Sequence, residues 1–150
     1  MGKERLEDFI DDFALLIEAG FVAVKQLDET SASRLFHAAQ AMNPMSTAPQ
    51  IGLGYIALNK LEVKEATRIY EDVLKKEPDN YLAQTFLGMC LLLTKAKRKK
   101  GKKMIEEAKA KSNDPTVKNL CDISLTWAEK DLEKKNIPFF AVDRDTEEEE

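Results

Sequence analysis

The sequence has little of the residue types from which catalytic and metal sites are built. Its 150 residues include one histidine, His37, and two cysteines, Cys90 and Cys121. Two cysteines cannot form a disulfide framework, and each lies in an apolar helical pattern, so we expect reduced thiols in the core of a cytosolic protein. His37 has no metal-ligand cluster around it, and the sequence shows no glycine-rich phosphate loop or nucleophile elbow. We therefore predict no catalytic residue, no metal site and no cofactor, and a protein that is not an enzyme.

Long apolar runs are also missing. No segment approaches the ~18 apolar residues that span a bilayer. The first ten residues mix both charge signs and lack the apolar segment of a signal peptide. We therefore expect a cytoplasmic protein without membrane insertion. The composition, 43% hydrophobic and 33% charged with a net charge of −4, is typical of a globular domain and does not indicate a dedicated nucleic-acid binder.

What the sequence does contain is an internal repeat. Four kinds of residue recur at an interval of 34 residues: Gly20, Gly54 and Gly88; Pro44 and Pro78; Ala32 and Ala66; and Phe36, Tyr70 and Met104. That interval is the period of the tetratricopeptide repeat, a helix-turn-helix unit, and the second copy resembles it best. Glycine and alanine let two helices approach to about 8–10 Å, and proline ends the second helix. The aromatic residue is expected to fill the space toward the neighbouring unit.

The pattern predicts an all-α fold of three tetratricopeptide-like helix-turn-helix repeats and a C-terminal capping helix, stacked as a short right-handed superhelix. The predicted helices cover residues 4–26, 31–42, 49–59, 63–76, 81–93, 98–111 and 115–134. We expect Thr30 or Ser31 to cap the second helix, and Asp114 followed by Pro115 to begin the last. The predicted divisions are a helical N-terminal extension (1–12), the repeat domain with its capping helix (13–134) and a flexible acidic tail (135–150).

The third repeat departs from this register. Lys100 stands where the second helix should carry a small residue, and Gly101 follows one position later. We interpret the offset as a one-residue slip in the turn between the two helices. That turn, where a small residue is expected, holds Leu27, Leu61 and Lys95 in the three copies.

Stacked repeats curve so that the first helix of each unit lines a concave face. In tetratricopeptide repeats this face comes from positions 2, 5, 9, 12 and 13 of each unit, and most of them are apolar here. The predicted partner-binding groove consists of Ile17, Phe21, Val24, Ile51, Tyr55, Leu58, Leu82, Met89 and Leu92. Family members that bind carboxylate-ended chaperone tails carry Lys and Asn at positions 5 and 9, which hold Ile17 and Phe21 in the first repeat. An apolar groove instead favours an amphipathic helix or an extended hydrophobic segment. As an alternative, part of this set packs on a flanking helix or on a dimer partner.

Residues 111–125, KSNDPTVKNLCDISL, are similar to the needle-subunit chaperones of bacterial type III secretion systems. Those proteins have a polar turn, Asp-Pro and an amphipathic helix after the third repeat, and the resemblance covers residues 13–134. It implies a cytoplasmic chaperone, part of a virulence system, that masks the self-polymerising helix of a secreted needle subunit. It also implies a small helical co-chaperone on the N-terminal helix, with Ile10, Phe13 and Leu16 as candidate contacts. A translocator chaperone, a general tetratricopeptide adaptor or scaffold of an unrelated pathway, and a self-associating repeat protein are the alternatives.

Two charged segments stand apart from the repeat. Lys95–Lys103, KAKRKKGKK, has seven basic residues in nine but no interleaved aromatic residue. We interpret this run as a solvated turn rather than a nucleic-acid contact. A docking patch for an acidic partner, or for the acidic tail of the chain itself, is the second interpretation. The tail also carries Phe139 and Phe140, which we expect to fold back into the groove or to pack on the last helix, with contact to a partner as the alternative.

Overall fold

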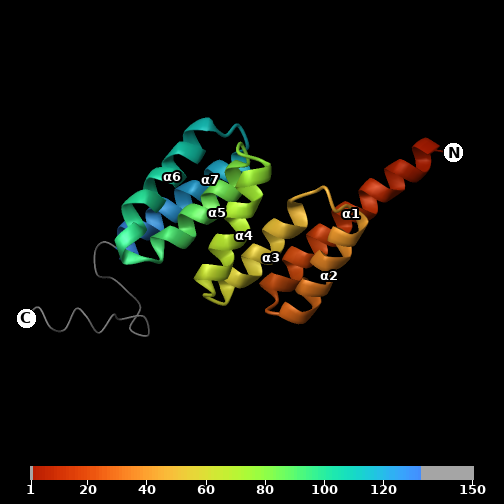
Figure 1. Cartoon of the computed structure of the whole chain (residues 1–150), viewed down its shortest axis with the longest axis horizontal. Coiled ribbons are helices and arrows are strands. Elements are labelled where there is room, and N and C mark those ends of the chain that lie inside the picture. Colours follow the sequence, from red (N-terminus) through yellow and green to blue (C-terminus); the bar gives the residue numbers. More distant parts are fainter. Residues whose placement is uncertain (1, 133–150) are drawn as a thin grey trace, which may run out of the picture.

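The computed structural model describes residues 2–132, and every regular element in that range is helical. The elements are α1 (Gly2–Lys25), α2 (Glu29–Met42), α3 (Ala48–Asn59), α4 (Val63–Lys76), α5 (Tyr81–Leu92), a 3₁₀ turn (Lys95–Lys97), α6 (Arg98–Lys111), α7 (Pro115–Trp127) and a π-helical turn (Ala128–Leu132). The helices pair in chain order as α1/α2, α3/α4 and α5/α6, and α7 packs beside α6 (Figure 1). The predicted all-α repeat fold is confirmed. The tail beyond residue 132, with Phe139 and Phe140, lies outside the described residues.

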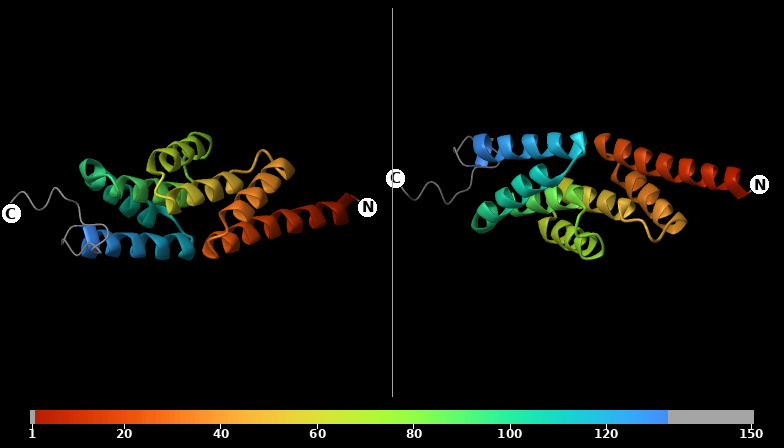
Figure 2. Two further views of the ribbon diagram at one scale, coloured as in Figure 1. Left: turned by 90° about the horizontal axis from the view of Figure 1, so that it is seen from below. Right: turned by 90° about the horizontal axis from the view of Figure 1, so that it is seen from above.

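The stack is elongated and curved. In Figure 1, α1 lies at one end and α6 with α7 at the other, and the N-terminal end of α1 extends past α2. Figure 2 shows α1 and α7 on the same side of the stack and α4 on the opposite side. The first helix of each unit lines the concave face of stacked helical repeats, and we therefore assign the side that carries α1 as the concave side.

The periodic glycines mark where the two helices of a pair meet. The Phe36 ring is fully buried between Gly20 of its own pair and Gly52 of the next, and a Cβ added at Gly20 would lie 2.6 Å from that ring. Gly54 receives Tyr70 in the same way, with a corresponding distance of 2.7 Å. The predicted role of these glycines, and of the aromatic residues between units, is confirmed.

The third pair shows the slip that its sequence indicates. Ile105, not Met104, packs against Gly88, and a Cβ added at Gly88 would lie 2.6 Å from Ile105 Cγ1. Helices α5 and α6 also meet at Gly101, because a Cβ added there would lie 2.6 Å from the carbonyl oxygen of Gly88. The cause is the extra 3₁₀ turn over Lys95–Lys97, which delays the start of α6 relative to the other second helices. Met104 recurs at the 34-residue interval, but the residue one position later takes the place of Phe36 and Tyr70, as the predicted one-residue slip requires.

The first two turns have a different geometry from the third. Leu27 and Leu61 adopt left-handed backbone conformations, with φ of 61° and 58°. Around Leu27, the Asp28 N–H donates to the carbonyl of Ala23 at 2.9 Å and the Leu27 N–H to that of Val24 at 3.0 Å. These two bonds form a Schellman motif, in which glycine is usual at the position of Leu27.

The helix starts test the predicted caps. Asp28, not Thr30 or Ser31, caps α2, because its Oδ1 accepts from the Ser31 N–H at 3.0 Å. The Schellman turn places Asp28 directly before the first turn of α2, so the expected caps lie inside the helix. At α7 the prediction is confirmed: Asp114 Oδ1 accepts from the Thr116 N–H at 2.8 Å, and Pro115 is the first helical residue.

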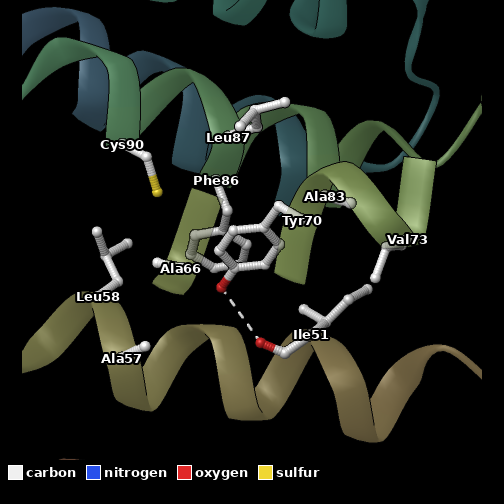
Figure 3. Close-up of a cluster of buried hydrophobic side chains, with 10 residues drawn as sticks. All are labelled: Ile51, Ala57, Leu58, Ala66, Tyr70, Val73, Ala83, Phe86, Leu87 and Cys90. Carbon is white, nitrogen blue, oxygen red and sulfur yellow. Dashed lines mark hydrogen bonds between the residues drawn. The ribbon is translucent and has the colours of Figure 1, made fainter. Parts of the chain in front are cut away.

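The core consists of three clusters of buried side chains, and Figure 3 shows the one built from α3, α4 and α5. The Tyr70 hydroxyl donates to the carbonyl of Ile51 at 3.2 Å, and the Tyr70 ring stacks on Phe86 at a centroid distance of 5.3 Å. Burial raises the pKa of Tyr70, and the hydroxyl therefore stays neutral in the fold. Cys90 and Cys121 are both buried free thiols, as predicted.

Candidate partner-binding face

The concave side carries a row of large apolar side chains contributed by α1, α3 and α5. Phe21, Tyr55 and Met89 occupy the same position of successive first helices, and each is half-buried. The rings of Phe21 and Tyr55 lie 5.8 Å apart, and Tyr55 in turn lies 5.6 Å from Phe86. These contacts hold each ring against the core while part of its surface faces outward.

The predicted groove residues divide into two groups by burial. Five are half-buried and define what we call the apolar face: Ile17, Phe21, Tyr55, Leu82 and Met89. The other four are core residues with at most 8% of their surface exposed: Val24, Ile51, Leu58 and Leu92. Their positions on the helices point toward neighbouring helices of the stack rather than outward. A partner on this side would contact the first group, and the second group supports it.

The third pair contributes less to this face than the first two, because α7 packs on it. Leu82 and Met89 pack partly against a cluster that includes Val117 and Cys121 of α7. Thr85 is fully buried, with its hydroxyl 3.3 Å from the sulfur of Cys121. The alternative that part of the set covers a flanking helix therefore holds for the third pair.

The apolar face has no charged donor at its centre. The positions that hold Lys and Asn in carboxylate-binding domains are here Ile17, Phe21, Ile51, Tyr55, Thr85 and Met89. The Thr85 hydroxyl donates to the carbonyl of Tyr81 at 2.7 Å, so its hydrogen is used within the helix. At the rim, Asn59 Nδ2 donates to the carbonyl of Tyr55 at 2.8 Å. A row of half-exposed apolar side chains of this kind suits the apolar side of a helix and offers little to a carboxylate.

A second apolar surface lies on the N-terminal half of α1. The candidate co-chaperone residues share one stripe of the helix: Ile10 is 55% exposed, and Phe13 and Leu16 are half-buried. The structure adds Leu6 and Phe9, exposed by 57% and 38%, to the same stripe. The sequence contains the signal for these two residues, because Leu6 and Phe9 lie four positions before Ile10 and Phe13 and share their helix face.

A polar cleft of about 470 Å³ separates α2 from α4 above α3, and His37 lies in its lining. Charged side chains border this cleft, and Lys60 Nζ pairs with Glu29 and with Glu62, each at 2.9 Å. Within residues 2–132, no group of three or more His, Cys, Asp or Glu side chains could hold a metal ion. The cleft is therefore a poor match for an apolar helix, and His37 has no ligand partners within the described range.

The remaining features are the Cys90 thiol and the apolar character of the helices. Burial raises the pKa of the Cys90 thiol to about 11, which keeps it protonated and unreactive near neutral pH. Among the helices of the described range, none combines the length and the apolar character that crossing a bilayer demands.

Comparison with known proteins supports the fold. No protein-family model matches the chain, and no curated protein matches its sequence. Solved structures do match, among them a chain from a structure described as "CopN-Scc3 complex", with a TM-score of 0.56 and 17% sequence identity. The match covers 77% of this chain and 68% of that chain. A similarity at this level of identity shows the fold alone, and it agrees with the all-helical stack.

Proposed function

We propose that this protein is a cytoplasmic type III secretion chaperone that holds the amphipathic helix of a secreted needle subunit on its apolar face and prevents premature polymerisation. The observation that carries the proposal is the row Phe21, Tyr55 and Met89, which is apolar, half-exposed and without a charged donor at its centre. The similarity to a chain from a complex of two proteins, CopN and Scc3, supports a chaperone that binds a secreted protein. The resemblance of residues 111–125 favours the needle subunit as the client.

The physical basis is competition for one helix face. A subunit that assembles through an amphipathic helix polymerises when that face is free. Burying one large apolar side chain contributes about 1.5–3 kcal/mol. If the client helix buries three or four such side chains at positions i, i+3, i+4 and i+7, the free energy gained would exceed the free energy that ordering the helix costs. The client helix then stays monomeric until export removes it from the chaperone.

The N-terminal half of α1 is the proposed site of a small helical co-chaperone. Leu6, Phe9 and Ile10 are exposed. They lie in the N-terminal half of α1, and the N-terminal end of this helix extends beyond α2 (Figure 1). Acidic side chains flank this stripe, among them Glu7 and Asp11. Two copies of α1 packed together would bring these like charges into contact, so an apolar helix with basic flanks fits better than a second copy.

The test is co-expression of the chain with a recombinant needle subunit, followed by purification of the complex. We expect Tyr55→Lys and Met89→Lys each to abolish the complex, because an ammonium group would enter the contact with the client helix. Lysine is chosen since its stem can cover the core while its charge stays in water. Unchanged thermal unfolding confirms that each variant is folded.

Met45→Lys is the matched control. Met45 is 89% exposed in the connection between α2 and α3, so the same substitution there should leave the complex intact. If Tyr55→Lys and Met89→Lys fold and still bind the subunit, the apolar face is not the binding site. Recovery of a translocator protein or of self-oligomers instead of the needle subunit would refute the named client.

A further inference from the structure

A basic cluster surrounds the start of α6. We define it as the seven basic residues of Lys95–Lys103, which lie in the 3₁₀ turn and the first turns of the helix. The first turn of α6 contains no acidic residue. Within residues 2–132, Lys97, Lys99, Lys100 and Lys103 form no ion pair. Five of the six lysines in the cluster are exposed. The start of α6 therefore carries a concentrated positive charge, and these four lysines have no ion-pair partner among residues 2–132.

The chain leaves the described fold close to this cluster. Only Ser112, Asn113 and Asp114 connect α6 to α7, so the two helices run antiparallel. The end of α7 consequently lies by the start of α6, as both Figure 1 and Figure 2 show. The ion pair between Lys109 and Asp122, at 2.5 Å, holds the two helices together farther along. Whatever follows Leu132 begins beside the basic cluster.

The sequence that follows carries the opposite charge. Asp143–Glu150 contains six acidic residues and one arginine. The ten residues between Leu132 and Asp143 can span roughly 35 Å when extended. Helix α6, with 14 residues, is roughly 21 Å long. The acidic segment can therefore reach every basic residue of the cluster.

We propose that the acidic segment Asp143–Glu150 docks on the basic cluster of its own chain and screens it from polyanions. A short tether gives the segment an effective concentration in the millimolar range at the cluster, well above that of a second copy in dilute solution. The cluster lacks the interleaved aromatic residues that stack on single-stranded bases. Its charge would still attract nucleic acid non-specifically if it were left open.

The experiment compares the full-length chain with a full-length variant in which Asp143, Asp145 and Glu147–Glu150 are replaced by their amides. Amide NMR spectra at low salt should differ between the two proteins at residues 95–103, independently of protein concentration from about 20 to 500 µM. In 1 M salt the two spectra should coincide in that region, because screening releases the segment. Residues of α2, far from the cluster, serve as the internal control.

The second readout is the affinity for a fluorescein-labelled single-stranded oligouridylate at 50 mM salt. The amide variant should bind the oligonucleotide at least about tenfold more tightly than the natural chain, with a steep dependence on salt. Lys99→Gln with Lys103→Gln, added to the amide variant, should remove that gain. Identical NMR spectra at low salt, differences that grow with protein concentration, or unchanged oligonucleotide affinity would each overturn the proposal.

Discussion

Leu27 and Leu61 end the first helices of two successive pairs in a backbone conformation that favours glycine, and Leu27→Gly provides a direct test of that geometry. At φ of 61°, the Cβ of leucine costs about 1–2 kcal/mol. Glycine loses about 0.4–1 kcal/mol more chain entropy on folding. The Leu27 side chain is 90% exposed, so its removal loses almost no apolar burial. We therefore expect Leu27→Gly to raise the free energy of unfolding by about 0.5–1 kcal/mol, or the Tm by about 1–4 °C.

Urea unfolding followed by circular dichroism at 222 nm measures the change, and two further variants isolate its cause. Leu27→Ala removes the same apolar side chain but keeps the Cβ, so the strain stays and stability should change by less than about 0.5 kcal/mol. Leu61→Gly relieves the same strain, but Leu61 is 70% exposed and its partial burial offsets the gain. If Leu27→Ala stabilises the protein as much as Leu27→Gly, the effect comes from removing an exposed leucine, and the reasoning from φ is refuted.

Two other predictions concern the core. Gly52→Ala should lower the free energy of unfolding by about 1–2 kcal/mol, because the added Cβ would overlap the Phe36 ring and the strain exceeds the gain in helix propensity. In a chain that already carries Phe36→Leu, the same substitution should cost less. Additive effects of the two substitutions in a double-mutant cycle would contradict the contact. Burial raises the pKa of the Cys90 thiol from its ordinary 9.0 to about 11, so the stabilising effect of the neutral thiol is full below about pH 9 and is lost as the pH rises toward 11. Urea midpoints from pH 7 to 10.5 should therefore fall less steeply for Cys90→Ala than for the natural chain, and parallel curves would contradict that assignment.

Much of the fold could be predicted because the repeat register has a simple steric cause. Two helices approach closely only where one lacks a side chain, so Gly20 and Gly54 locate both the pairs and the rings that fill them. The expected bounds of α4 and α6 agree with the structure for the same reason. In the third pair the offset of Gly101 indicates a one-residue slip, which brings Ile105 to Gly88. The 3₁₀ turn that causes the slip could not be predicted from the 34-residue interval.

Turn geometry was harder to predict than helix positions. Tetratricopeptide repeats usually carry a small residue at this turn, so Leu27 and Leu61 are unusual there. The sequence does not reveal that both leucines nevertheless adopt the left-handed backbone conformation. The same turn decides which residue caps α2, because Asp28 is both the last residue of the Schellman motif and the cap. Local propensity ranks Asp28 and Ser31 alike, and only the path of the chain separates them.

The candidate site shows a similar limit. Periodicity identifies the side of a helix that is apolar, but not what covers it. Val24 and Leu58 are buried by neighbouring helices, and α7 covers part of the third pair, so only half-buried residues such as Phe21 and Tyr55 stay available to a partner. This division arises from packing between neighbouring pairs, which the sequence of a single repeat does not contain.

The most direct test of the proposed function is site-specific photocross-linking. Benzoylphenylalanine is placed at Phe21, at Tyr55 or, as a control, at His37 in the polar cleft on the other side of α3. Each protein is irradiated with the needle subunit, and the cross-linked peptide is identified by mass spectrometry. We predict cross-links from positions 21 and 55 to an amphipathic helix of the subunit and none from position 37. Cross-links from position 37 alone, or none from the two positions on the apolar face, would contradict the claim that this face holds the client.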